Sequence, residues 1–332
     1  MNDPGRSNQR NTDRVANLPD ASLRQLLQPI LLALVLSGLF VLSFLVNEGG
    51  RAIDNMDRRQ LIGTCLLFVL LPTYFVAVLR FQQRRGPELL ATLQAVAPGK
   101  PLATLQERYR RVPSVLAGAT LVIGACFGLT QNYYLVSYLR ASGSLSSIDL
   151  AIMLGNALVW ALATLVLCWK LDISFRLRRL GAQLDVDPYR LQTLRPMGHL
   201  ATLDVLMVAG ALAFMPLQAL DAEFRIENFQ WGLIIGVPAA VLFFFLPMLG
   251  VRQRIRACKA ARIAELEALE TAIPRDEVTR LELHWAHLER VQGLSDWPLD
   301  VPLVARTIGY AILAPMAWVA AALVEQALDQ WT

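Results

Sequence analysis

Two histidines in the C-terminal third of the sequence have the spacing of a metal-binding pair. His284 and His287 lie three residues apart, so on a helix both side chains project from one flank. A zinc site would need two further ligands, and Glu282 and Glu289 are the candidates nearby. The sequence has neither an HExxH motif nor a Cys/His cluster to complete such a site. We therefore interpret the pair as part of a solvated helix flank and expect no bound metal.

Two ionisable residues, Asp204 and Arg306, fall within apolar segments that are predicted to enter a membrane. Charged side chains are costly in lipid, and where they occur they face partners or water. Each lies within about two helical turns of the predicted inner boundary. A salt bridge between them is therefore the simplest interpretation. A proton or ion path through the pair, and separate contacts of each side chain with the membrane surface, are the alternatives.

Recognisable catalytic and cofactor-binding motifs are absent from the sequence. It has no GxGxxG fingerprint, no Walker lysine loop, no GxSxG nucleophile elbow and no pair of intramembrane aspartates. Its four cysteines form no CxxC pair, and none lies in a predicted outer segment. We therefore expect free thiols. The sequence predicts a non-enzymatic protein without a cofactor.

Long uncharged runs dominate the chain and indicate its class. Of the 332 residues, 55% are hydrophobic and 17% are charged, a composition typical of a protein solvated by lipid. A helix needs about 20 mostly apolar residues to cross the hydrocarbon core. The runs predict an all-α, polytopic transmembrane bundle of about seven spans, at residues 25–47, 60–79, 112–139, 150–169, 205–220, 228–251 and 307–324.

Basic residues are distributed unevenly between the predicted spans. Of the 31 Lys and Arg residues, 25 fall in the N-terminal tail and in residues 80–111, 170–195 and 252–290. By the positive-inside rule these segments are cytoplasmic, so the N-terminus lies in the cytoplasm and the C-terminus lies outside the inner (plasma) membrane. The same distribution accounts for the net charge of +4. No nucleic-acid partner is needed to explain it.

The predicted spans also define the domain organisation. Residues 1–24 are polar and are expected to form a disordered cytoplasmic tail. The remaining segments are a six-span bundle at 25–251 with inner amphipathic loops at 80–111 and 170–198, a cytoplasmic helical hairpin at 252–300, a seventh span at 301–326 and an outer tail at 327–332.

Glycines, prolines and arginines predict how the bundle is packed and interrupted. Gly124 and Gly128 form a GxxxG pair in the third span, which favours close packing either within the chain or between two copies. Gly86-Pro87 is expected to break the first inner loop. Residues 173–180 alternate apolar side chains with three arginines, a pattern typical of a helix that lies on anionic lipid.

The polar segment 252–300 predicts a hairpin of two helices. Pro274 separates two amphipathic stretches, and both ends of the segment enter the same membrane face, so the helices are expected to run antiparallel into the cytoplasm. The apolar stripe of the second helix is only partly matched by the first, whose facing positions include Lys259 and Arg262. We predict an interaction surface at Val278, Leu281, Trp285 and Leu288.

The end of the chain resembles the C-terminal signature of a set of uncharacterised prokaryotic multi-pass membrane proteins. The resemblance spans residues 240–326 and rests on Pro247, Gly250-Val251, Lys259, the run Ser295-Asp-Trp-Pro-Leu-Asp300, Arg306, Tyr310, Pro315, Trp318 and Ala322-Leu-Val-Glu325. The sequence departs from the signature at Leu299, where the family has Phe, and at Ala320-Ala321, where it has paired glycines. The resemblance implies no activity. Trp297 and Pro298 are expected to mark the cytoplasmic interface.

Two classes of function are compatible with these patterns. The favoured one is a non-enzymatic interaction, scaffold or sensory module that acts through the cytoplasmic hairpin. Its partners would be the lipid bilayer and either a cytoplasmic protein or a second copy of the chain. The alternative is a channel or transporter component, since prolines and glycine pairs within spans allow helices to bend and to approach closely. The prolines concerned are Pro72, Pro216, Pro238, Pro247 and Pro315.

Overall fold

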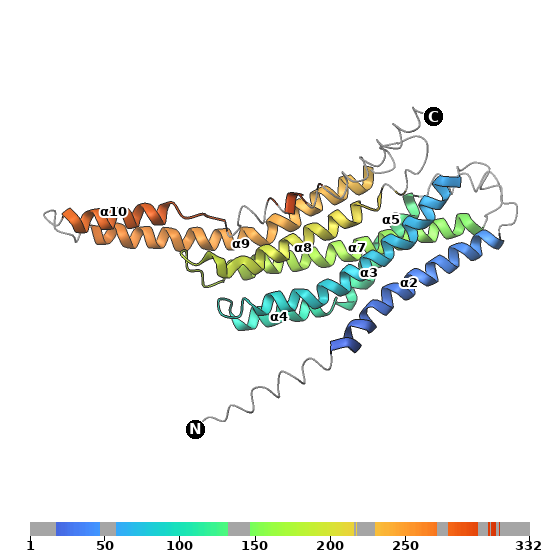
Figure 1. Cartoon of the computed structure of the whole chain (residues 1–332), viewed down its shortest axis with the longest axis horizontal. Helices are drawn as coiled ribbons and strands as arrows, with labels where there is room; N and C mark the ends of the chain where they lie inside the picture. Colours follow the sequence, from blue (N-terminus) through green and yellow to red (C-terminus); the bar gives the residue numbers. More distant parts are fainter. Residues whose placement is uncertain are drawn as a thin grey trace, which may run out of the picture. The chain divides into compact units, whose positions relative to one another are not determined.

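The computed structural model describes residues 18–46, 58–131, 147–215, 217, 230–270, 278–297, 305, 307–309 and 312. All regular structure in these residues is helical, and they contain no strand, as the sequence predicts. The helices are α2 (Leu18–Val46), α3 (Arg58–Ala91), α4 (Gly99–Arg110), α5 (Ser114–Gln131), α7 (Ser147–Gly181), the 3-10 turn η1 (Leu191–Leu194), α8 (Arg195–Leu212), α9 (Gln230–Glu270) and α10 (Val278–Gln292) (Figure 1).

Five of the described helices contain segments long and apolar enough to cross a membrane. The segments are Leu27–Val46, Ile62–Ala91, Ser114–Gln131, Ser147–Gly181 and Gly232–Glu270. They coincide with five of the seven predicted spans, and they identify the chain as a membrane protein. Of the other two predictions, span 205–220 begins in α8 and continues past the described residues, and span 307–324 lies mostly outside them. The span count of seven therefore stays a prediction.

The chain divides into two compact units. Unit 1 comprises Met1–Phe81, Gly118–Val166 and Phe214–Arg225, and unit 2 comprises Gln82–Ala117, Leu167–Ala213 and Ile226–Thr332. The boundaries fall within α3, α5 and α7, so each of these helices contributes residues to both units.

Within unit 1, α5 packs against α7 through the predicted glycine pair. A Cβ at Gly124 would lie 2.7 Å from the Cα of Ala161, and one at Gly128 would lie 2.8 Å from the Cα of Ala157. Asn156 Nδ2 also donates a hydrogen bond to the carbonyl of Gly128 (2.9 Å). Only glycine permits backbones to approach so closely. The GxxxG pair is therefore used for packing within the chain, one of the two possibilities that the sequence left open.

One predicted break and one predicted surface helix are wrong. α3 continues through Gly86 and Pro87 to Ala91, and the missing side chain of Gly86 lets the ring of Tyr109 contact its backbone. Residues 173–180 do not form a separate helix on the lipid surface, because they are the last turns of α7. Most of the apolar stripe that suggested a lipid contact is buried inside unit 2 instead, since Ile173 and Leu177 are 0% and Leu180 is 3% exposed, whereas Phe175 is 45% exposed.

α9 contacts α8, α10 and the end of α7. Gly250 packs on the carbonyl of Arg178, and a Cβ at Gly181 would lie 2.9 Å from the backbone nitrogen of Val251, so two glycines facing each other let α7 and α9 touch. α9 is a single helix that runs without a break from the apolar segment into the polar one at Arg252. α10 lies alongside its C-terminal part (Figure 1).

Candidate functional site

A buried ion pair joins α7 and α8 in unit 2. Lys170 Nζ lies 2.6 Å from Asp204 Oδ1, and both side chains are 1% exposed. A lysine and an aspartate are rarely buried so completely unless each is paired with the other. Ion pairs of this kind contribute little net stability, since desolvation offsets their attraction. Their retention in a membrane bundle therefore identifies the pair as a candidate functional site.

Two further side chains, Gln82 and Tyr109, complete the polar cluster around this pair. Gln82 Nε2 of α3 donates to Asp204 Oδ1 (3.2 Å) and lies 3.7 Å from the sulfur of Met207. Lys170 Nζ donates a second, longer hydrogen bond to the Tyr109 hydroxyl of α4 (3.4 Å). Four different helices, α3, α4, α7 and α8, therefore supply one residue each. We call these residues the polar cluster: Gln82, Tyr109, Lys170 and Asp204.

Aromatic rings hold the Lys170 ammonium in place. Its Nζ lies 4.8 Å from the ring centroid of Tyr109 and 5.4 Å from that of Trp169, within the range of cation–π contacts. Trp169 Nε1 is anchored in turn by the carbonyl of Arg108 (3.2 Å). Burial raises the pKa of the Tyr109 phenol well above its ordinary value, and the charge of Asp204 raises it further. Tyr109 is therefore a neutral hydroxyl at physiological pH.

Two acceptors in the polar cluster lack a donor among the described residues. These buried atoms are Asp204 Oδ2 and Gln82 Oε1. Both belong to side chains whose other polar atom is already engaged. An unsatisfied buried acceptor costs about 1–3 kcal/mol, so the cluster has capacity for a further hydrogen-bond donor.

The structure places Asp204 with Lys170, whereas the sequence suggested Arg306. Arg306 lies outside the described residues, so its predicted pairing with Asp204 stays a prediction. Its neighbour Thr307 shares a hydrogen bond with Thr202 of α8 (3.0 Å). Sequence reasoning missed Lys170 because it directly follows the uncharged run 150–169 and was taken as the end of a span. The available signal for Lys170 as a buried partner was its position as a charged residue directly bordering this uncharged run.

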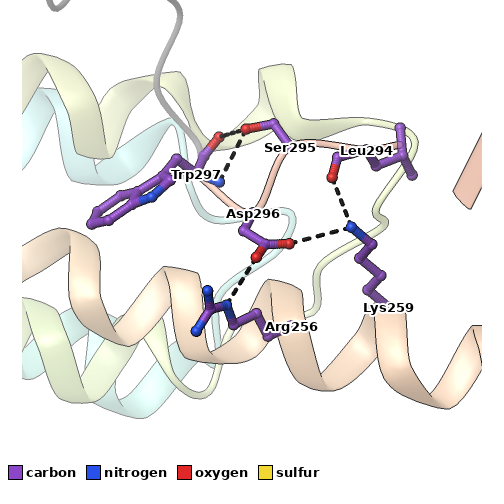
Figure 2. Close-up of polar contacts among 6 residues, drawn as sticks. All are labelled: Arg256, Lys259, Leu294, Ser295, Asp296 and Trp297. Carbon is purple, nitrogen blue, oxygen red and sulfur yellow. Dashed lines mark hydrogen bonds and ion pairs between the residues drawn. The ribbon is translucent and has the colours of Figure 1, made fainter. Parts of the chain in front are cut away.

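A second cluster joins the end of α10 to α9. Asp296 accepts hydrogen bonds from Arg256 Nε (2.9 Å) and Lys259 Nζ (3.4 Å), and Lys259 also donates to the carbonyl of Leu294 (2.9 Å) (Figure 2). The hydrogen bond from Arg256, supported by Lys259, holds the pKa of the Asp296 carboxyl below its ordinary value. We call Arg256, Lys259 and Asp296 the Asp296 junction.

Trp297 lies next to this junction and contacts the apolar part of α9. The Arg252 guanidinium lies 4.4 Å from the centroid of its ring, and the ring of Phe245 lies 6.0 Å away, edge-on. Ser295 forms a local turn with the Trp297 backbone (Figure 2). The indole therefore sits where α9 changes from apolar to basic, which is a usual place for tryptophan at a membrane interface.

The predicted interaction surface lies on α10. Trp285 is 52% exposed, and its Nε1 donates to Glu270 Oε1 at the end of α9 (3.0 Å). Leu281 and Leu288, on the same helix face, are half-buried, and nothing is described of the Val278 side chain. Sequence reasoning missed two leucines that are also exposed, Leu269 (55%) and Leu283 (69%). The buried α10 residue is Val291, at 0%.

The remaining candidates show no metal chemistry. His287 Nε2 hydrogen-bonds the Tyr189 hydroxyl (2.7 Å), and His284 Nε2 is buried without a partner in the described part of the chain. In the same residues, no three His, Cys, Asp or Glu side chains are grouped closely enough to hold a metal ion. All four cysteines are free thiols, as predicted: Cys65, Cys126, Cys168 and Cys258.

Comparison with known proteins adds no relative to this description. No protein-family model, no curated protein and no solved structure matches the chain. The resemblance of residues 240–326 to a family signature therefore stays a prediction, and the function has to be argued from the two clusters and the surface of α10.

Proposed function

We propose that the protein is a non-enzymatic interaction module of the inner membrane that binds a cytoplasmic protein through α10 and the end of α9. We call α9 from Arg252 to Glu270 together with α10 the arm. The observation that carries the proposal is the half-exposed indole of Trp285, which is oriented by Glu270. Leu269 and Leu283 are further exposed apolar side chains of the arm. A tryptophan held in one orientation is an effective binding anchor, because little entropy is lost when it is covered.

The charge of the arm indicates the chemistry of the partner. Residues 252–261 carry four basic and no acidic side chains, whereas the rest of the arm, residues 262–270 and 278–292, carries five acidic and three basic ones, a net charge of −2. Around Trp285 the neighbouring charges include Glu270, Glu282 and Glu289. A basic segment with an apolar anchor, such as an amphipathic helix, would complement this surface.

The same charge pattern argues against a second copy as the occupant. Two copies in one membrane have the same orientation, so their arms project in the same direction and place acidic parts side by side. Like charges in such a contact are unfavourable. A cytoplasmic protein is therefore the better fit of the two partners that the sequence left open.

Crosslinking in native membranes tests the proposal, with wild type compared with Trp285→Ala and Leu283→Ala. We expect an adduct whose mass exceeds that of the chain but is not twice that mass, and whose yield falls at least tenfold in Trp285→Ala. The purified full-length protein in zwitterionic nanodiscs should also bind a labelled leucine–lysine helical peptide more tightly than a leucine–glutamate one. Empty nanodiscs give the baseline, and Val115→Ala, which alters an exposed side chain (84%) outside the arm, is the matched control.

Two outcomes would contradict this function, and a third calls for another variant. An unchanged crosslink in Trp285→Ala would remove the anchor, and an adduct of twice the chain mass would identify a second copy as the occupant. If Trp285→Ala unfolds, the indole belongs to the core of the arm. Leu283→Ala then decides the question, because that side chain is 69% exposed and its loss should weaken the adduct without unfolding.

A channel or transporter component is the second candidate, and the polar cluster is the observation that favours it. A lysine and an aspartate buried within a membrane bundle are typical of ion and proton pathways as well as of structural pairs. Ion flux into liposomes containing the purified protein separates the two functions. A flux that Asp204→Asn abolishes would replace the interaction module with a transport function.

A further inference from the structure

The unsatisfied acceptors of the polar cluster point to a ligand that supplies a hydrogen-bond donor or a proton. Asp204 Oδ1 already accepts from Lys170 Nζ (2.6 Å) and from Gln82 Nε2 (3.2 Å), whereas Oδ2 has no donor among the described residues. Gln82 Oε1 is the second unsatisfied acceptor, and it belongs to the amide that is bonded to Asp204. Within the described part of the chain, two side chains in direct contact therefore each have one acceptor without a donor.

The charge of the cluster limits what can bind there. A metal cation at Oδ2 would lie close to the Lys170 ammonium, which is within 2.6 Å of the same carboxylate, and like charges repel strongly where water is excluded. A proton does not add a separate ion, because it converts the carboxylate into a neutral acid. The new O–H then becomes a donor, and Gln82 Oε1 is the acceptor that lacks one.

We propose that Asp204 is a proton-binding site within the bundle, with Gln82 and Lys170 as its positioning residues. A hydronium ion supplies the proton: one of its O–H bonds breaks to leave water, an O–H bond forms at Oδ2, and the net charge of the cluster rises from zero to +1, carried by Lys170. Among the described residues, the groups that face Asp204 from other helices are Lys170 of α7, Tyr109 of α4 and Gln82 of α3. Gln82 does not titrate, and Tyr109 keeps its proton. None of these four residues belongs to the arm.

Infrared difference spectroscopy of the full-length protein in nanodiscs tests the site. Spectra recorded at falling pH should show the C=O stretch of a protonated carboxyl group that is absent in Asp204→Asn. Asp296→Asn, which removes an aspartate of the arm, should keep the band. In Gln82→Leu the band should remain but move to higher frequency, because the hydrogen bond to the glutamine is lost. A purely structural ion pair would produce none of these signals.

The proposal is overturned if no Asp204-dependent band forms over the pH range in which far-ultraviolet circular dichroism shows a folded protein. A band that persists unchanged in Asp204→Asn would likewise assign the proton to another carboxyl group. If Asp204→Asn does not fold, Asp204→Glu keeps the acid. In protein labelled with ¹³C-aspartate, the isotope shift of the band should then be present in wild type and lost in Asp204→Glu, and a shift that survives would overturn the proposal.

Discussion

The buried pair of Lys170 and Asp204 has consequences at the scale of single residues. Each side chain is 1% exposed, so removing either one leaves an unpaired charge in a region without water. Breaking such a pair costs about 3–5 kcal/mol, whereas replacing both partners with apolar residues is often neutral. The pair therefore makes the stability of unit 2 depend on both residues together.

We expect Lys170→Met and Asp204→Leu each to lower the free energy of unfolding by about 3–5 kcal/mol, and the double variant to lose much less than the sum. Reversible unfolding in mixed micelles measures the three variants. Removing the exposed pair of Arg84 and Glu88, whose side chains are 45% and 50% exposed, should cost roughly 0–1 kcal/mol and serves as the control. Additive losses at Lys170 and Asp204 would show that the two residues act independently.

A second double-mutant cycle tests the partner that the sequence suggested for Asp204. If Arg306 also interacts with Asp204, then Asp204→Asn and Arg306→Gln should show a coupling of roughly 0.5–3 kcal/mol in the same unfolding measurement. Strict additivity would leave Lys170 as the ionic partner and remove Arg306 from the site.

The Asp296 junction makes the attachment of α10 sensitive to acid. The pKa of Asp296 is lowered by its hydrogen bond from Arg256 and by Lys259. Its stabilising contribution is therefore fully present above the ordinary aspartate pKa of about 3.9. The contribution is lost as the pH falls through the lower pKa of the folded state. Hydrogen exchange of the α10 amides, corrected for intrinsic rates, should accelerate in this acid range in wild type. In Asp296→Asn the exchange should be faster near neutral pH and lack this added acid dependence, and an identical acid response would contradict the role.

At the scale of helices, the contact between α5 and α7 depends on missing side chains. A Cβ at Gly124 would overlap the carbonyl of Trp160 and approach the Cα of Ala161, whereas a Cβ at Gly118 on the same helix meets nothing within 4 Å. Gly124→Ala should therefore destabilise the protein by about 1–3 kcal/mol. Gly118→Ala should be neutral or stabilise by about 0.4–1 kcal/mol. Thermal unfolding compares the two, and equal effects would show that α5 does not pack closely on α7.

At the scale of the whole molecule, the distribution of basic residues predicts the orientation of the chain. With 25 of the 31 Lys and Arg residues assigned to one side, the arm should be cytoplasmic and Thr332 should lie outside. Reporter fusions at residue 270 and at the C-terminus should therefore report opposite sides of the membrane. Reporters on the same side would rule out seven spans.

The sequence alone determined the class of the protein and five of its membrane helices. An uncharged run of this length can cross a membrane, where no water is present to bond the backbone. A helix satisfies all its backbone hydrogen bonds within one segment, so these runs predict helices. The close approach at Gly124 and Gly128 was also readable, since glycine is the residue that permits it. Both inferences depend on local chemistry and need no knowledge of neighbouring helices.

Only the tertiary structure decided which residues meet. Asp204 pairs with Lys170 and Gln82 from two other helices. Ile173, Leu177 and Leu180 are buried in the protein rather than in lipid. In a membrane both the lipid-facing and the protein-facing sides of a helix are apolar, so periodicity does not reveal which side is covered. The rotation of each helix, and hence the partner of each buried charge, follows from packing between helices that are distant in the sequence.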